Sequence, residues 1–391
     1  MESIVSIDKE YVAGTYGRFP VELVEGKGST VKDLGGKEYI DMGSGIGVTA
    51  FGFADEEWTN AVTAQLMTLQ HTSNLYYTQP CAKLAKVLCE KTGLKKVFFS
   101  NSGAEANECA IKVARKYSAQ KKGENCYTIV TLKQSFHGRT LTTLAATGQD
   151  HFHQDFLPLT PGFVHVEANN IDELNAAVNE TTAGIMIEIV QGEGGVNPLT
   201  REFVAECTRL ANELDIPLIV DEVQTGNGRT GKLYAYQHFG IQPDIVSTAK
   251  GLGGGLPIGA TMMGEKVQDV LKPGDHGSTY GGNPVCSAGA LSVIERLDEN
   301  FLNSVRRKSG YVFSALCNAP GIESVTGLGF MIGIKTTKPA REVVMECMNR
   351  GVLCLTAKDK VRLLPALNIS MDELCRAIDI LKEVCAEPTR A

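Results

Sequence analysis

Between residues 97 and 248, short apolar runs alternate with stretches of helical periodicity. The runs have the length of strands, and they are rich in β-branched and aromatic residues. They occupy 97–99, 127–131, 184–190, 217–221 and 245–248, with helices expected at 105–117 and 201–214. This alternation predicts an α/β fold, in which a mostly parallel or mixed sheet lies between helices on both faces.

The two ends of the chain follow another pattern. Residues 18–42 contain short alternating runs and glycine turns, which predict a small antiparallel hairpin region. Helices are expected at 55–70, at 79–92 and again from about 289, followed by strands at 329–334 and 361–364 and a helix at 370–386. We therefore expect an N-terminal segment (1–48) and a C-terminal part (289–391) that together form a smaller α+β domain, and a large domain at 49–288.

Charge and hydropathy exclude several classes of protein. The chain of 391 residues has 38 basic and 45 acidic residues and a net charge of −7, which argues against binding to nucleic acid or to an anionic membrane. No apolar run approaches the length of a membrane-spanning helix. The N-terminal sequence MESIVSIDKEY has no basic region followed by a long apolar one, so we expect no secretory signal.

The 11 cysteines are scattered, and none stands in C-x-x-C spacing. We expect reduced thiols in a cytoplasmic protein and no metal site. His151 and His153 flank Phe152 and would face one way on an extended segment, but further ligands cannot be identified, so a pair of loop residues is the better interpretation.

Lys250 follows a strand-length apolar run and precedes a glycine-rich turn. A lysine at a strand end is often a plain surface residue, but in a buried cleft it can lose its proton and act as a nucleophilic amine. Asp221 ends the preceding strand, 29 residues earlier. This distance suits one strand–helix–strand crossover, which would bring Asp221 and Lys250 to one cleft beyond the strand ends.

Three glycine-containing segments are candidate ligand sites. Ser102-Gly103-Ala104 lies between a strand and a helix, where free N–H groups can bind a phosphate, although it is equally compatible with a plain capped turn. The segment from Ser135 to Arg139 offers an aromatic ring for stacking and a guanidinium for a carboxylate. His276–Pro284 offers hydroxyls and glycines, for another phosphate contact or simply a loop.

The loop Gly226–Lys232 matches G-x-G-x-x-G and almost matches a P-loop. Leu233 replaces the hydroxyl residue that holds magnesium, and no convincing helix opens inside the motif. A tight glycine turn is therefore favoured, while a nicotinamide-dependent oxidoreductase stays open as a distant alternative.

Taken together, these segments are specific. The chain resembles the class III, fold-type I, pyridoxal-phosphate-dependent aminotransferases, and among them the acetylornithine and ornithine aminotransferases. The resemblance extends nearly from end to end. The matching blocks are NSGAEAN (101–107), SFHGRT (135–140), QGEGG (191–195), VDEVQTGNGRTGK (220–232), STAKGLGGGLPIGA (247–260) and HGSTYGGNP (276–284).

The resemblance implies a role for each cofactor-binding residue. Lys250 would form a Schiff base with pyridoxal 5′-phosphate and shuttle a proton, and Asp221 would pair with the pyridinium nitrogen. Gly103 and Ala104, with Ser102 nearby, would bind the phosphate. Phe136 would stack on the ring, and Gln224 would lie near its 3-hydroxyl. Residues 49–288 would then be the cofactor-binding domain.

The resemblance also implies residues for the substrate and for a second subunit. Arg362 would bind the α-carboxylate of glutamate or 2-oxoglutarate, Arg139 a second carboxylate, and Glu193 would pair with Arg362 when the other substrate is bound. Tyr16 would line the entrance. Ser278 and Thr279 would reach the phosphate of the neighbouring subunit, so the site requires a homodimer.

The implied reaction is the ping-pong transfer of the terminal amino group of N2-acetylornithine to 2-oxoglutarate, in arginine biosynthesis. Ornithine, succinylornithine and 4-aminobutyrate are alternative substrates, because residues 72–78 carry two tyrosines where close relatives vary. Ile189 stands where the family usually has proline, a harmless departure. A non-catalytic cofactor-binding regulator is a further alternative, against which the lysine, the aspartate and both arginines argue.

Overall fold

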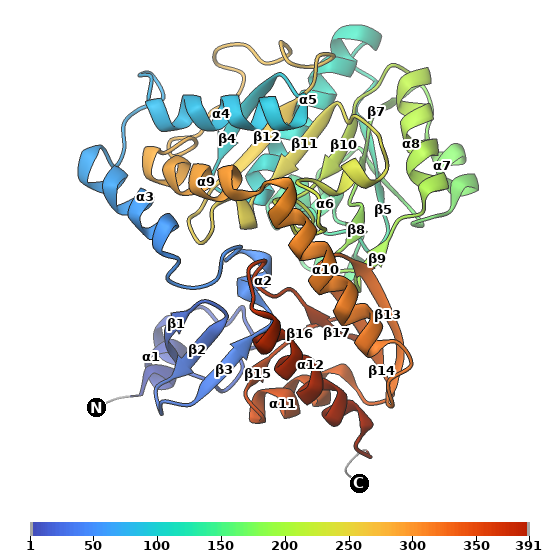
Figure 1. Cartoon of the computed structure of the whole chain (residues 1–391). Helices are drawn as coiled ribbons and strands as arrows, with labels where there is room; N and C mark the ends of the chain where they lie inside the picture. Colours follow the sequence, from blue (N-terminus) through green and yellow to red (C-terminus); the bar gives the residue numbers. More distant parts are fainter. Residues whose placement is uncertain (1–2, 389–391) are drawn as a thin grey trace.

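The computed structural model describes residues 3–388 and is built around a central sheet (Figure 1). Within these residues the sheet has seven strands in the order β4-β12-β11-β10-β7-β5-β6. Their bounds are β4 (Lys96–Ser100), β5 (Thr128–Leu132), β6 (Phe163–Val166), β7 (Thr182–Ile187), β10 (Leu218–Asp221), β11 (Ile245–Thr248) and β12 (Gly259–Met263). Only the pairs that involve β12 are antiparallel, so the expected mostly parallel α/β sheet is confirmed.

Helices cover both faces of this sheet. Ile219 and Ile245 pack with α5 (Gly103–Lys122) in one core cluster. Their neighbours Val220 and Val246 face the opposite side, where α4 (Gln79–Thr92) and α8 (Arg201–Glu213) contribute to the main core. Burial on both faces explains why these strands are continuous apolar runs in the sequence.

Further helices extend this part of the molecule. The packing of α9 on α3 and α4 holds the outer layer together. The helices are α3 (Glu56–Thr68), α6 (Leu141–Ala146), α7 (Ile171–Ala177) and α9 (Pro284–Arg296), and the short 3-10 helices are η1 (Asp150–Phe152), η2 (Ala235–His238) and η3 (Lys250–Leu252). The domain boundary expected at 288/289 falls inside α9, and the three domain ranges stay predictions.

A second part of the molecule combines both ends of the chain, below the large sheet in Figure 1. One sheet has the order β1-β2-β3-β15 and the other β13-β14-β17-β16. The strands are β1 (Leu23–Lys27), β2 (Thr30–Asp33), β3 (Glu38–Asp41), β13 (Ile322–Leu328), β14 (Met331–Thr336), β15 (Val352–Leu353), β16 (Leu355–Ala357) and β17 (Lys360–Leu363). Because β15 pairs with β3 in parallel, the N-terminal hairpin region and the C-terminal strands share a sheet.

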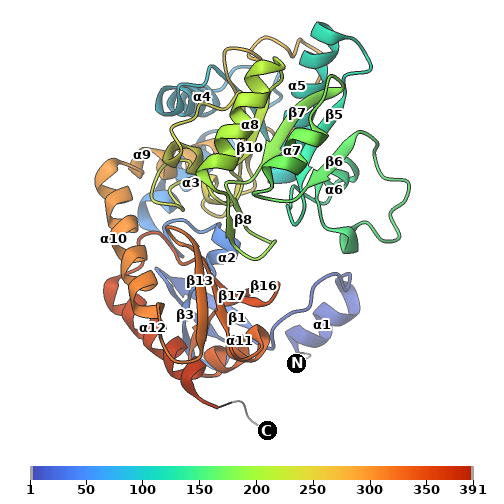
Figure 2. The ribbon, with the colours of Figure 1, turned by 90° about the vertical axis from the view of Figure 1, so that its right-hand side faces the viewer.

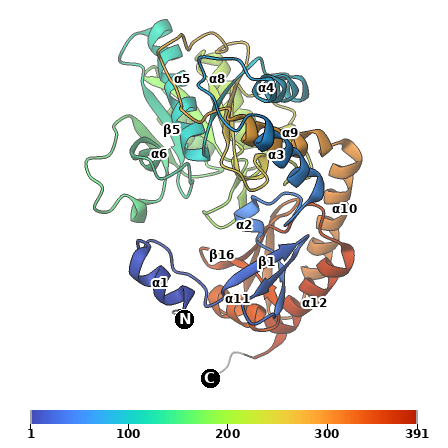
Figure 3. The same ribbon diagram turned by 90° about the vertical axis from the view of Figure 1, so that its left-hand side faces the viewer.

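Helices α10 (Glu299–Leu316), α11 (Ala340–Asn349) and α12 (Met371–Ala386) complete the smaller part (Figure 2). The helix α1 (Ile4–Tyr11) has no buried residue, and it lies apart from the two small sheets, on the side of β16, in Figures 2 and 3. A short turn, α2 (Ser44–Gly47), leads from β3 into the larger part.

The run expected as one strand at 184–190 is wrong in its length. The strand β7 ends at Ile187, and Val190–Gln191 (β8) pairs with Asn197–Pro198 (β9) in a separate small ribbon. The break leaves Glu188 at the strand end, where its carboxylate accepts hydrogen bonds from the N–H groups of Phe136 (3.0 Å) and Gly192 (3.4 Å). An apolar run alone does not reveal such a break.

No helix in the described part of the chain is long and apolar enough to cross a membrane. Within residues 3–388 there is likewise no group of three or more His, Cys, Asp or Glu side chains arranged to hold a metal ion.

Candidate active site

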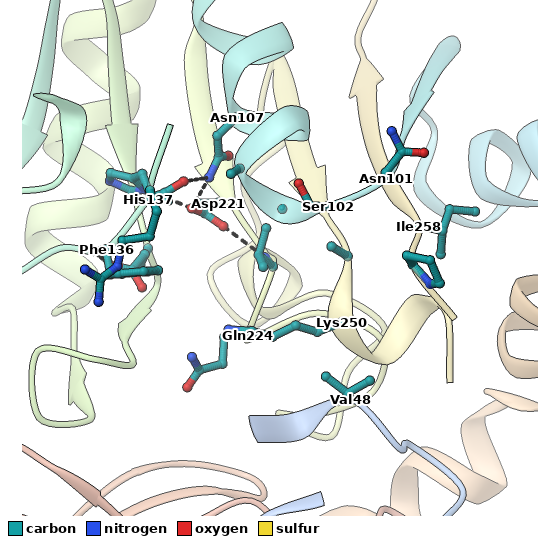
Figure 4. A pocket seen from close by; sticks show the side chains of 18 of the residues that line it. Val48, Asn101, Ser102, Asn107, Phe136, His137, Asp221, Gln224, Lys250 and Ile258 are labelled. Carbon is teal, nitrogen blue, oxygen red and sulfur yellow. Dashed lines mark hydrogen bonds and ion pairs between the residues drawn. The ribbon is translucent and has the colours of Figure 1, made fainter. Parts of the chain in front are cut away.

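A cavity of about 470 Å³ lies beyond the ends of β10 and β11, beside the start of α5 (Figure 4). Asp221 is the last residue of β10, and it is in register with Ser247 of β11, three residues before Lys250. Both Asp221 and Lys250 line the cavity. The crossover expected from the sequence therefore brings the two side chains into one cleft, at the edge where open α/β sheets bind ligands.

Asp221 is held by a closed set of hydrogen bonds. Its side chain is 4 % exposed. One carboxylate oxygen accepts from Asn107 Nδ2 and from His137 Nδ1, both at 2.8 Å, and the other accepts from the backbone N–H of Val223 at 3.0 Å. Ser247 Oγ donates to Asn107 Oδ1 at 2.5 Å. The network fixes the carboxylate in position and satisfies a charge that burial would otherwise make costly.

The imidazole of His137 sits behind Asp221. Burial alone would lower its pKa, but the hydrogen bond and charge of Asp221, together with the charge of Glu188, raise it on balance. Its Nε2 atom has no hydrogen-bond partner in residues 3–388. The carboxyl of Glu188 also lines the cavity, and burial raises its pKa to about 7.

Lys250 is half-buried and has a left-handed backbone, with φ at 43°. Burial lowers the pKa of its amine, although the Glu193 carboxylate acts in the opposite direction. A depressed pKa raises the share of neutral, nucleophilic amine. Figure 4 shows the Lys250 side chain near Gln224 and above Val48 of the smaller part.

The N-terminus of α5 forms another wall of the cavity. Ser102 is its N-cap, and its hydroxyl accepts from the N–H of Glu105 at 3.2 Å. Gly103 and Ala104 are the first helical residues, whose N–H groups have no acceptor inside a helix and sit at the positive end of its dipole. A Cβ atom on Gly103 would stand 2.6 Å from Cγ1 of Val223, so glycine is needed for this close approach. An anion such as a phosphate fits here.

Arg362 and Glu193 form an ion pair beside the cavity, with Nη1 and Oε1 at 2.5 Å, but neither side chain lines the cavity itself. Gln224 joins them, because it accepts from Arg362 and donates to Glu193, both at 3.4 Å. Burial alone would raise the pKa of Glu193, but the charge and hydrogen bond of Arg362 lower it on balance. Arg362 is 3 % exposed, and its Nε has no partner among the described residues.

Phe136 and Arg139 lie at the rim of the cavity. The guanidinium of Arg139 is 5.5 Å from the ring centre of Phe136 and 4.0 Å from that of Phe152. Arg139 is exposed and is not part of an ion pair in residues 3–388. The arrangement leaves a cation free to meet a carboxylate that enters the cavity.

Besides Arg362 and Glu193, three predicted residues do not line the cavity. Tyr16 is 74 % exposed, with the Arg18 guanidinium 5.5 Å from its ring centre. Ser278 and Thr279 line neighbouring surface hollows instead. Ser278 is joined to the cavity wall only through Asn101, whose Nδ2 donates to its hydroxyl at 3.2 Å.

Sequence analysis missed several residues of the site. No role was predicted for His137, Asn107, Glu188 or Ser247. One signal was available: Asn107 follows Gly103 by four residues, so it lies on the same face of the helix. Ser247 gave no such signal, because its partner comes from another element 140 residues away.

The loop 226–232 is a packed turn. No helix opens inside it in the described structure, since β10 ends at Asp221 and the next element is the 3-10 turn η2 (Ala235–His238). Arg306 and Leu297 fill the space beside Gly231 and Gly228. A dinucleotide site here is excluded, because the motif needs a helix N-terminus and open space for a pyrophosphate.

The donor set fits pyridoxal phosphate. Asp221 is an anion held for a protonated ring nitrogen, Lys250 offers an amine of lowered pKa, and the α5 start offers the N–H groups of Gly103 and Ala104 to a phosphate. Phe136 lines the space between them. His137 Nε2, a buried atom without a partner, lies behind the aspartate and does not compete for the ligand.

Comparison with known proteins agrees with this geometry. The family model described as Aminotransferase class-III matches residues 11–385. The chain belongs to the class III aminotransferases, and its fold is that of the fold-type I enzymes.

Particular relatives are also similar over the whole length. The chain is 49 % identical to the acetylornithine aminotransferase of Haemophilus ducreyi over 99 % of both chains. It is 43 % identical to the acetylornithine aminotransferase of Methanocaldococcus jannaschii, over 99 % of this chain and 98 % of the relative.

Solved structures give the same picture. The ornithine aminotransferase of Toxoplasma gondii superposes with a TM-score of 0.94 at 30 % identity, covering 97 % of this chain and 94 % of the other. The N-acetylornithine aminotransferase of Stenotrophomonas maltophilia superposes with a TM-score of 0.84 at 32 % identity, covering 98 % of both.

Proposed function

We propose that the protein is a pyridoxal-phosphate-dependent aminotransferase that moves the terminal amino group of N2-acetylornithine to 2-oxoglutarate, and the reverse, in arginine biosynthesis. The observation that carries the proposal is the Arg362–Glu193 ion pair, which Gln224 joins to the wall of the cavity lined by Lys250 and Asp221. Relatives at 41–49 % identity named as acetylornithine aminotransferases support it.

Pyridoxal phosphate, when bound, supplies an aldehyde that takes up an amino group and a ring that withdraws electrons. Asp221 holds a proton on the ring nitrogen by pairing with it, and Asn107 and His137 keep the carboxylate aimed. The α5 N-terminus binds the phosphate through Gly103 and Ala104. The Lys250 amine removes and returns the proton at the substrate's α- or terminal carbon.

The Arg362–Glu193 pair suits two unlike substrates. When a dicarboxylate is bound, Arg362 releases Glu193 and binds the α-carboxylate, while Arg139 binds the other carboxylate. When a substrate with a terminal amine is bound, Glu193 neutralises Arg362, and an apolar or neutral carbon chain can pass. Gln224, which contacts both partners, stabilises either arrangement.

A panel of amino donors with 2-oxoglutarate tests the proposal. We expect N2-acetylornithine to give the highest kcat/KM among N2-acetylornithine, ornithine, succinylornithine and 4-aminobutyrate. A clear preference for one of the other three would replace the substrate and keep the class. The purified protein should also be yellow and bleach with borohydride; a colourless protein that does not respond to added cofactor would contradict the cofactor assignment.

We also propose a homodimer in which Thr279 of one subunit reaches the phosphate site of the other. Support comes from exposed apolar residues near Thr279, on the loop after α3 and on the segment after Thr279 itself. They are Leu75, Tyr76, Tyr77 and Tyr280, at 88 %, 70 %, 106 % and 61 % exposure. Large apolar side chains exposed in this number are typical of a subunit interface.

A subunit-mixing experiment tests the shared site. Lys250→Ala and Thr279→Ala homodimers should each have low activity. After exchange of subunits, heterodimers carry one site with Lys250 and Thr279 both intact, so roughly a quarter of the sites should recover. Activity that stays at the average of the two parents would overturn the shared site.

The cytoplasm is the proposed location. All 11 cysteines fall within the described residues and are free thiols, which suits a reducing compartment.

A further inference from the structure

A second hollow, of about 730 Å³, lies on the outer side of Arg362. Its walls come from the segment before β1, the end of β14, the start of α11 and the β16–β17 hairpin. We call it the outer groove. Its lining includes these cations: Lys335, Lys338, Arg341, Lys358 and Arg362. Arg362 also connects this groove to the catalytic cavity, because its Nη1 donates to Glu193 and to Gln224, and Gln224 lines that cavity.

Carboxylates do not cancel this charge. Glu323 and Asp359 also line the outer groove, and Asp359 is paired with Lys335. No described residue forms an ion pair with Arg341 or Lys358 within 4 Å. The unpaired positive charge is thus concentrated at the hairpin and at the start of α11.

Lys358 occupies a position that favours glycine. Ala357 and Lys360 are paired in the hairpin, so Lys358 and Asp359 form its two-residue turn. The φ angle of Lys358 is 55°, in the left-handed region, and the side chain is exposed. For a residue with a Cβ this conformation costs roughly 1–2 kcal/mol. A lysine held there, without an ion pair in residues 3–388, points to a use for its charge.

Arg341 also stands against local preference. It is in the first turn of α11, whose N-cap, Pro339, makes no side-chain hydrogen bond. A cation near a helix N-terminus opposes the helix dipole and reduces helix stability. The helix start and the guanidinium add two sources of positive potential to the same groove.

The positive charge of the β16–β17 hairpin also acts on His151, a residue of the larger part of the molecule. Burial lowers the pKa of His151, and the charges of Lys358 and then Arg139 lower it further. Lys358 comes from the smaller part of the molecule and Arg139 from the larger part, where it lines the catalytic cavity. The two cations, one from each part of the molecule, therefore both act on His151. The buried Nε of Arg362, without a partner among the described residues, is a further donor on this path.

We propose that the outer groove captures dicarboxylate oxo acids, of which 2-oxoglutarate is the proposed substrate, and delivers them to Arg362. The inference rests on the proposed function, and it adds the class of substrate that the groove selects, the dicarboxylate oxo acids. The whole chain carries a net charge of −7, which repels a dianion, so a local cationic approach is needed to concentrate it. N2-acetylornithine has one carboxylate and one ammonium group, so it is neutral overall and gains little from the groove.

The test compares Lys358→Gly, Arg341→Gln and the double variant with the wild-type holoenzyme. Glycine accepts the left-handed turn, so Lys358→Gly keeps the fold. We expect KM for 2-oxoglutarate to rise about 3-fold in each single variant and about 10-fold in the double variant, with kcat unchanged. KM for N2-acetylornithine should stay the same, and the rise of KM for 2-oxoglutarate with added salt should become weaker.

A matched control is Arg307→Gln. Arg307 is an exposed residue of α10, which lies on the far side of the smaller part from β16 in Figure 2. The Arg307→Gln variant loses one positive charge, as Arg341→Gln does, and should leave both KM values unchanged. An equal rise of both KM values in Lys358→Gly, or no change in either, would overturn the proposal.

A binding measurement separates this inference from the proposed function. If the wild type does not transfer amino groups between N2-acetylornithine and 2-oxoglutarate, the proposed function fails by itself. Glutarate, a dicarboxylate without a reactive group, can then be titrated calorimetrically into the holoprotein, with butyrate as the monoanion control. We expect the double variant to bind glutarate about 10-fold more weakly than the wild type does. Equal binding would overturn the groove.

Discussion

The Asp221 wall of the catalytic cavity and the Arg362 wall, which reaches the cavity through Gln224, both hold a buried charge, but they hold it in different ways. Asp221 accepts hydrogen bonds from Asn107, His137 and a backbone N–H, and none of these donors is exposed. Arg362 relies on one carboxylate, Glu193, whose side chain is 29 % exposed.

The difference shows which contacts must stay and which must change during the reaction. A carboxylate fixed by several neutral or positive donors is suited to a permanent partner, because every rearrangement would leave a buried donor unpaired. An ion pair with one partly exposed partner can open at smaller cost, because water can replace the lost contact. The Asp221 wall therefore serves the cofactor, and the Arg362 wall serves two substrates of different charge.

Loss of Lys250 should have the largest effect. Lys250→Ala removes the amine that stands between the two walls, and turnover should fall on the order of 10³-fold or more. Steady-state kcat with N2-acetylornithine and 2-oxoglutarate measures it. Lys83→Ala, on the exposed side of α4, is the control and should be as active as the wild type. Near-normal turnover in Lys250→Ala would break the assignment of both walls.

Asp221→Asn tests the fixed wall directly. An amide in place of the carboxylate keeps the shape but removes the charge, and its NH2 group cannot accept from Asn107 and His137. We expect kcat/KM to fall about 10²- to 10³-fold for every amino donor alike. A loss of kcat/KM confined to one amino donor would show that the Asp221 wall also selects substrates. This would contradict its assignment to the cofactor alone.

More of the Asp221 wall than of the Arg362 wall could be predicted from the sequence, and the reasons are physical. Asp221 and Lys250 end neighbouring strands, so the alternation of strands and helices was enough to bring them together. Arg362 lies in a strand of the smaller part, and only the resemblance to a family linked it to Glu193. The network behind Asp221 needs three separate elements, and no local pattern predicts that His137 and Ser247 meet there.

Gly103→Ala tests how tightly the fixed wall is packed. The new Cβ would stand 2.6 Å from Cγ1 and 2.9 Å from Cγ2 of Val223, and overpacking of this kind costs about 1–3 kcal/mol. Urea unfolding of the cofactor-free protein measures it. Gly310→Ala is the matched control, because nothing lies within 4 Å of the new Cβ in α10, and it should stabilise by about 0.5–1 kcal/mol. If Gly103→Ala left the free energy of unfolding unchanged, the packing around Gly103 would be able to adjust to the new Cβ.

The smallest expected effect is on the pH dependence of the free energy of unfolding, and it comes from Glu222, the residue after Asp221. Its carboxylate accepts from Thr225 Oγ1 (2.6 Å) and from the N–H of Tyr236 (2.8 Å), and burial raises its pKa to about 7. Between its ordinary pKa and about 7, the folded protein binds more protons than the unfolded one. This contribution to stability is therefore present at low pH and is lost as the pH rises to about 7, by up to about 1.4 kcal/mol per pH unit.

Glu222→Gln removes this titration. The free energy of unfolding of the cofactor-free variant, measured between about pH 5 and 8, should fall less steeply than that of the wild type. Glu188, whose pKa burial also raises to about 7, keeps a similar slope in both proteins. An identical slope in variant and wild type would mean that Glu222 is ionised in the folded state and that the fixed wall holds one more charge.

The exchange of Glu193 for substrate at Arg362 is the central claim, and Glu193→Gln tests it most directly. Single-turnover absorbance of the holoenzyme measures each half-reaction separately, with N2-acetylornithine or with glutamate as donor. In the variant, Arg362 is no longer neutralised. We predict that kcat/KM for N2-acetylornithine falls about 10-fold while that for glutamate stays the same or rises. An equal loss with both donors would contradict the account.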